Sequence, residues 1–183
     1  MKKSLTIIIF LICLYRIDAQ LYNEYVNDKQ INQFMIHLLV TKTTYKNAFN
    51  KDFKKIYYKP IHIGKANWSM YDKLNENLSF EVRFKKLFKR SDLNKNDFDF
   101  MKNQYQTIKD TEWNFEHRKL KLKKIYRKNY FKYSIPIFNK DMTLAIMWRY
   151  KYCGSLCAYS ELHIYEFKNG KWKIKELIDG WIS

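Results

Sequence analysis

The sequence has little glycine or proline, with four glycines and two prolines in 183 residues. No stretch rich in proline, glycine or serine divides the chain, and no segment is repeated. These absences argue against a flexible linker between separate domains. We therefore expect a single domain, because a chain of this length can bury a core of its own.

The sequence also lacks the common signatures of catalysis and cofactor binding. It has no nucleophile elbow, phosphate-binding loop or dinucleotide fingerprint, and no histidine pair at helical metal spacing. We predict no cofactor, no metal site and no catalytic residue, which favours a non-enzymatic protein. One alternative stays open: a hydrolase whose pocket joins His117 or His163 to a cysteine or a carboxylate. The candidate carboxylates are Asp141 and Glu161.

The N-terminus has the composition of a secretory signal peptide. Two lysines precede an apolar run from Leu5 to Leu14. That run is too short to cross a bilayer, which takes about 20 residues. We predict cleavage after Ala19 and a mature chain, residues 20–183, without a transmembrane helix. A lipid anchor on Cys13 and an uncleaved N-terminal anchor are the alternatives.

Cysteine is scarce, with three in the whole chain. Removal of residues 1–19 would leave two, Cys153 and Cys157, and an even number in an exported protein favours a disulfide. So short a loop would make the bond mainly a local clamp. Free thiols are one alternative. A zinc site would need two more ligands, and a nucleophile would need an oriented base.

Acidic residues are few beside basic ones, 18 against 35, which gives a formal net charge of +17. This excess predicts an anionic partner such as nucleic acid, anionic lipid or acidic glycan. Composition is the competing explanation, because the abundant Lys, Asn, Ile, Tyr and Phe all have A/T-rich codons. The candidate polyanion-binding residues form two clusters: Lys85, Lys86, Lys89 and Arg90, then Lys119, Lys121, Lys123, Lys124 and Arg127.

The first half of the mature chain, about residues 20–111, shows helical periodicity. Apolar residues recur at helical spacing from residue 27 to residue 58, with a cap at Asn27 or Asp28. Two further helices are expected, one over residues 80–89 and one from a cap at Asn94 or Asn96 to about residue 108.

From about residue 112 to residue 183 the apolar period changes to two. Residues 142–152 alternate as in a long strand, preceded by a turn at residues 139–141. Asn169-Gly170 is a typical two-residue hairpin turn between two further strands. The sequence therefore predicts an α+β fold, in which N-terminal helices pack on a C-terminal antiparallel β-meander.

The last fifty residues carry a resemblance. Four segments form the pattern: Pro136-Ile-Phe-Asn-Lys-Asp141, Cys153-Gly-Ser-Leu-Cys157, Asn169-Gly-Lys-Trp-Lys173 and Trp181-Ile-Ser183. This pattern resembles a family of uncharacterised secreted bacterial proteins. The resemblance implies export and a small α+β domain, and it implies no activity.

These features together predict a basic exported protein, periplasmic or secreted. Its expected role is that of a non-enzymatic binding or interaction module of the cell envelope. One sheet face and the loop around Cys153 and Cys157 would contact the partner, either an envelope protein or an anionic polymer. The alternative is a protein that binds polyanions through its basic surface.

Overall fold

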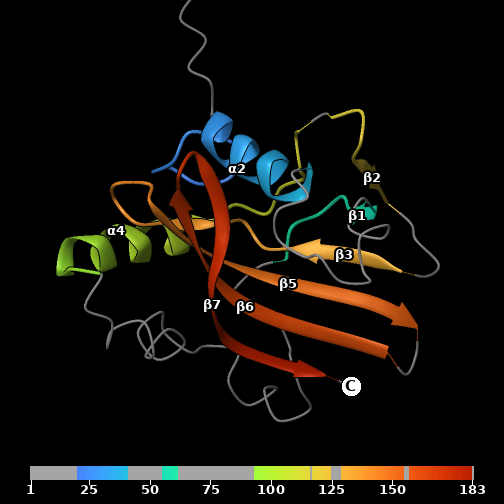
Figure 1. Ribbon diagram of the computed structural model, residues 1–183. Helices are drawn as coiled ribbons and strands as arrows, with labels where there is room; N and C mark the ends of the chain where they lie inside the picture. Colours follow the sequence, from blue (N-terminus) through green and yellow to red (C-terminus); the bar gives the residue numbers. More distant parts are fainter. Residues whose placement is uncertain are drawn as a thin grey trace, which may run out of the picture.

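The computed structural model describes residues 20–40, 55–61, 93–115, 117–124, 129–154 and 157–182. These residues form an α+β fold, which confirms the predicted class (Figure 1). The helices are α2 (Asp28–Val40) and α4 (Lys95–Gln106), and the strands are β1 (Lys55–Tyr57), β2 (Lys121–Lys123), β3 (Tyr130–Tyr133), β4 (Ile137–Phe138), β5 (Leu144–Gly154), β6 (Cys157–Lys168) and β7 (Lys171–Ile182). The helix predicted over residues 80–89 lies outside the described residues.

The strands form one sheet in the order β2-β1-β3-β5-β6-β7, and β4 pairs with β5. Strands β5, β6 and β7 are the predicted antiparallel meander. The sheet as a whole is mixed, because β1 pairs in parallel with both β2 and β3. Parallel neighbours need a long connection rather than a tight turn, and β1 precedes its two partners by more than sixty residues. The predicted antiparallel meander therefore does not extend to this edge of the sheet, where β1 lies between β2 and β3.

The first predicted helix is too long at its C-terminal end. Helix α2 ends at Val40, and residues 55–57, expected to be helical, form β1. Ile56 pairs with Phe131 of β3, and its side chain is fully buried in the core. Burial between neighbouring strands thus outweighs the local apolar spacing.

Both described helices begin where the sequence places their caps. The side-chain oxygen of Asn27 accepts the Lys29 N–H, 2.7 Å away, at the start of α2. Asn94 and Asp97 form a capping box at the start of α4, each side chain accepting the other residue's backbone N–H. These bonds satisfy donors that a helix leaves without an internal partner.

The core has a part on each face of the sheet. Helix α2 contributes Phe34, whose ring lies 5.5 Å from that of Tyr165 and 4.9 Å from that of Trp172. Helix α4 contributes Met101 to a second cluster, which includes Ile146 and Trp148 of β5. Alternate residues of β5 therefore face different parts of the core, as the period-two pattern predicts.

Two turns shape the C-terminal half. Asn169 and Gly170 have φ angles of 53° and 70°. This is the conformation that a two-residue hairpin requires, and it confirms the turn between β6 and β7. The turn at residues 139–141 is confirmed as well, because the Asn139 side chain accepts the N–H groups of Thr143 and Leu144.

Candidate functional site

A cluster of tyrosines lies at the end of β5 that leads to Cys153. Tyr130 pairs with Tyr152 across β3 and β5, and Lys132 pairs with Tyr150. Because side chains alternate along a strand, these four share one face of the sheet. Tyr57 of β1 joins them, with its ring centroid 5.9 Å from that of Tyr130. We call Tyr57, Tyr130, Lys132, Tyr150 and Tyr152 the tyrosine–lysine face.

The rings form a continuous row across three strands. The centroid of Tyr130 lies 5.3 Å from that of Tyr152, so Tyr57, Tyr130 and Tyr152 follow one another from β1 through β3 to β5. The Lys132 ammonium lies 4.5 Å from the ring centroid of Tyr57 and 5.9 Å from that of Tyr130. These distances allow cation–π attraction, which holds a positive charge against the aromatic row.

All five side chains of this face are half-buried. Burial lowers the pKa of the Lys132 ammonium. Burial raises the pKa of the Tyr130 hydroxyl, and the neighbouring tyrosines Tyr150, Tyr152 and Tyr57 add to the increase. Burial raises the pKa of the Tyr150 hydroxyl too, so Tyr130 and Tyr150 stay neutral at pH 7, and their hydroxyl groups can donate and accept hydrogen bonds.

Part of the second predicted basic cluster lies on β2 and just after it, next to the strand that carries Tyr57. Strand β2 is the neighbour of β1, and the Lys124 ammonium lies 5.4 Å from the ring centroid of Tyr58. Lys119 and Lys124 are exposed, whereas Lys121 and Lys123 are placed only as backbone positions of β2. The remaining predicted basic residues lie outside the described residues: Lys85, Lys86, Lys89, Arg90 and Arg127.

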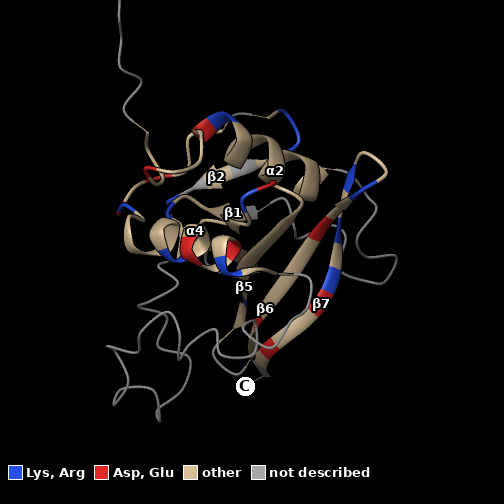
Figure 2. Ribbon diagram, turned by 90° about the vertical axis from the view of Figure 1, so that its left-hand side faces the viewer, with Lys and Arg blue, Asp and Glu red and all other residues tan. Residues whose placement is uncertain are grey.

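Elsewhere on the described chain, acidic residues accompany the basic ones. Figure 2 shows both basic and acidic residues on α4 and on β7. The meeting of tyrosines and lysines near β1–β3 is therefore a more distinctive feature than the total charge.

The two cysteines lie next to the tyrosine–lysine face, since Cys153 follows Tyr152. Their sulfur atoms are at disulfide distance, and their Cα atoms are 5.1 Å apart. The pair spans the connection between β5 and β6, where Gly154 pairs with Cys157. This agrees with the clamp predicted from the sequence. It places the clamp at one border of the tyrosine row.

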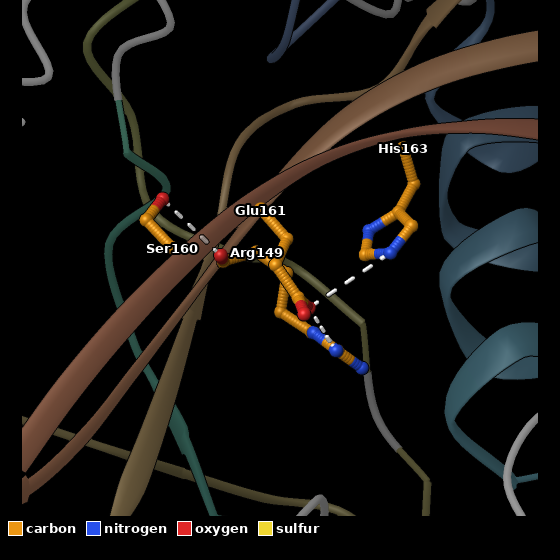
Figure 3. A network of polar contacts seen from close by, with 4 residues as sticks. All are labelled: Arg149, Ser160, Glu161 and His163. Carbon is orange, nitrogen blue, oxygen red and sulfur yellow. Dashed lines mark hydrogen bonds and ion pairs between the residues drawn. The ribbon is translucent and has the colours of Figure 1, made fainter. Parts of the chain in front are cut away.

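The opposite face of β5 and β6 carries a buried polar network (Figure 3). The Arg149 guanidinium donates to the Glu161 carboxylate, and His163 Nε2 lies 3.8 Å from the same carboxylate oxygen. The Arg149 side chain is only 6% exposed, and its guanidinium lies 5.6 Å from the ring centroid of Tyr159. The ion pair and the ring together stabilise a charge that would be costly to bury alone.

The histidine of this network was one candidate for hydrolysis. His163 does meet a predicted carboxylate, Glu161, but its side chain is 4% exposed. Burial, together with the positive charge of Arg149, lowers the pKa of His163 to about 3. A base of such low pKa accepts a proton poorly at neutral pH, and a substrate cannot reach a closed imidazole. The geometry supports a structural role.

The other predicted catalytic groups lie apart from this network. Asp141 is exposed in the turn before β5, and His117 lies in the segment before β2. His37 lies on α2, where its Nε2 accepts the Trp172 N–H at 3.3 Å, so it contacts the core as expected. Among the described residues, no group of three or more metal-binding side chains is present.

The tyrosine–lysine face is not evident in the sequence, because its members come from three distant segments. The alternation of Tyr150 and Tyr152 in one strand was visible, and so was Tyr130 with Lys132. These residues lie on the same face as Tyr57 because β1 pairs in parallel with β3. The signal in the sequence was the spacing of two residues between Tyr130 and Lys132 and between Tyr150 and Tyr152, which places each pair on one face of a strand.

Comparisons with protein-family models, with curated proteins and with solved structures find no match to this chain. Within the described part of the chain, neither helix is long and apolar enough to cross a membrane. Any inference about function therefore depends on the residues of this chain alone.

Proposed function

We propose that this protein is an exported, non-enzymatic binding module of the cell envelope, and that its tyrosine–lysine face contacts the partner. The observation that carries this proposal is the row of Tyr57, Tyr130 and Tyr152 with the Lys132 ammonium beside it. Aromatic rings provide a large contact area at little cost in side-chain entropy. Tyrosine is among the residues that dominate binding energy at interfaces.

The position of the clamp supports the same surface. The Cys153–Cys157 pair restrains the end of β5 that bears Tyr152, so the row has little conformational freedom to lose on binding. Export after Ala19, which would bring the chain to an oxidising compartment, is part of the proposal. The proposal also includes the packing of the whole N-terminal helical half on the meander. The contacts of Phe34 with Tyr165 and Trp172 support it.

A second candidate function is polyanion binding, which the position of Lys124 over Tyr58 favours. Basic residues alongside exposed rings can hold a single-stranded nucleic acid through its phosphates and bases. An acidic glycan would use the same lysines. The two candidates differ in their dependence on salt, because phosphate contacts release counterions and weaken as salt rises.

The test is a pull-down from envelope extract with immobilised protein, residues 20–183, at low and at high salt. We expect a partner that stays bound at high salt and is lost with Tyr152→Ala. Tyr25→Ala is the matched control, because Tyr25 is 44% exposed and lies outside the face. If both variants retain the partner equally well, the tyrosine–lysine face is not the binding surface.

Charge is tested with a second pair of variants, Lys132→Gln and Lys140→Gln, since Lys140 is exposed in the turn before β5. A single-stranded DNA oligonucleotide and heparin serve as polyanion probes. If binding is polyanionic, both probes dissociate as salt rises, and Lys132→Gln weakens binding more than Lys140→Gln. Salt-independent retention of an envelope protein would support the interaction module instead.

A further inference from the structure

A groove lies between α2 and the β6–β7 hairpin, away from the tyrosine–lysine face. Its volume is about 330 Å³. Figure 1 shows the turn that starts β7 beside α2. The helix presents Gln30, Gln33, Phe34 and His37 to this groove, four positions that share one side because helix neighbours are three and four residues apart.

The floor of the groove is aromatic. Phe34 is 1% exposed and Trp172 is 8% exposed, with ring centroids 4.9 Å apart. Phe167 closes one side, with its ring 5.3 Å from Trp172, and remains 45% exposed. An exposed phenylalanine beside a buried aromatic floor offers apolar contact to a small molecule.

The rim is polar, and a positively charged side chain lies next to it in the chain. Gln30 and Gln33 are exposed, and their amides make no hydrogen bond with other described residues. Lys171 lies between Gly170 and Trp172, which line the groove, and it pairs with Lys168 across the hairpin end; both lysines are exposed, and neither is itself a lining residue. Burial, followed by the charge of Lys171, lowers the pKa of His37, so this imidazole is neutral at pH 7. No acidic side chain is among the described residues that line the groove.

We propose that this groove is a binding site for a small monocarboxylate with an apolar body, such as a medium-chain fatty acid or an aromatic acid. The body would lie on Phe34, Phe167 and Trp172, and the carboxylate would face Lys171 and the glutamine amides. The volume is at the lower end of the range for ligand pockets, about 300–1,000 Å³, which suits a small ligand. The site is separate from the tyrosine–lysine face.

The test is a titration of the mature protein with three eight-carbon probes, octanoate, octan-1-ol and octylammonium, followed by ligand-observed NMR. We expect saturable octanoate binding, up to about fivefold tighter than that of octan-1-ol, the range for an exposed charge pair. Octylammonium should bind most weakly. Equal affinity for octanoate and octan-1-ol, or no saturable octanoate binding, would overturn the proposal.

Two matched pairs of variants locate the site. Phe167→Ala should weaken octanoate binding about tenfold, which is about 1.4 kcal/mol, whereas Leu177→Ala should not, because Leu177 is 53% exposed on β7 and does not line the groove. Lys171→Gln should weaken it more than Lys173→Gln, a change of equal charge, because Lys171 lies between the lining residues Gly170 and Trp172 and Lys173 does not. If both variants of a pair lose the same octanoate affinity, the ligand does not bind in this groove. Capture of an envelope partner by the tyrosine–lysine face should be unaffected by any of these changes.

Discussion

Arg149 and His163 are buried polar side chains, and both lie beside the half-buried carboxylate of Glu161. They occupy the face of β5 and β6 opposite the tyrosine–lysine face, and Arg149 reaches both a carboxylate and the ring of Tyr159. Arg149 and His163 alternate with apolar neighbours on their strands, so the period-two pattern could place them on a face. It could not show that this face is closed to solvent.

His163 makes stability depend on pH. Its native pKa of about 3 lies below the ordinary value of 6.5. As pH falls below 6.5, the unfolded imidazole takes up a proton that the native one refuses, so stability is lost until about pH 3. The free energy of unfolding should therefore fall by roughly 2–3 kcal/mol more in the wild type than in His163→Gln between pH 7 and pH 4.5. Urea unfolding at several pH values measures this difference.

His117→Gln is the control for that experiment. His117 lies in the loop before β2 and is not part of the Arg149 network. This variant makes the same substitution away from that network, so it separates the loss of His163 from the loss of any histidine. The structural role assigned to His163 fails if His163→Gln and the wild type lose stability in parallel as the pH falls.

At the scale of elements, α4 holds β4 through one side chain. Gln104 donates from Nε2 to the Phe138 carbonyl at 2.6 Å, and its Oε1 accepts the Phe138 N–H at 2.9 Å. The Asp97 carboxylate also accepts the Lys140 N–H at 3.1 Å. A buried amide thus serves as the hydrogen-bonding neighbour that the short strand lacks on that side.

Gln104→Leu should destabilise the protein by about 2–3 kcal/mol, because it leaves both backbone groups of Phe138 without a partner in the interior. Chemical denaturation of the variant and the wild type gives the difference. Gln106→Leu, at the exposed end of α4, makes the same substitution on the same helix and should cost little. Equal losses in the two variants would refute the bridging role of Gln104.

The Cys153–Cys157 clamp is also a property of one element, the β5–β6 hairpin. The chain-entropy effect of so short a loop is about 2 kcal/mol. We expect the double variant Cys153→Ser/Cys157→Ser to lose about that much stability and to keep its fold, because β5 and β6 remain paired along most of their length. Thermal unfolding of both proteins measures the loss. Free thiols in exported wild-type protein would rule the clamp out.

Sequence patterns predicted where helices and turns begin better than they predicted which strands pair. Caps at Asn27 and Asn94 and the Asn169-Gly170 turn follow from short-range chemistry, and all three are present. The strand nature of residues 55–57 was missed because it depends on Phe131, far along the chain. Cys153 and Cys157 were predicted as a pair, whereas the tyrosine row beside them required the register of β3 with β5.

For the molecule as a whole, the sequence predicts export after removal of residues 1–19. Protein recovered from the periplasm or the medium should begin at Gln20 and carry two fewer hydrogens than the reduced chain, from the Cys153–Cys157 bond. Intact mass spectrometry measures both. Ala19→Arg should leave the precursor uncut, since a small residue is favoured before the cleavage site. A chain that retains Met1, or a lipid on Cys13, would contradict this prediction.

The sequence by itself determined the α+β class, the helix caps, the hairpin turn and the pairing of two cysteines. Each of these depends on residues close together in the chain, where local geometry and hydrogen bonding suffice. Only the tertiary structure decided that β1 enters the sheet in parallel and that Tyr57, Tyr130 and Tyr152 form one row. It also decided that α2 and the β6–β7 hairpin enclose a groove. These features depend on which distant segments pair and pack, and that is set by the burial of the whole core rather than by any single stretch.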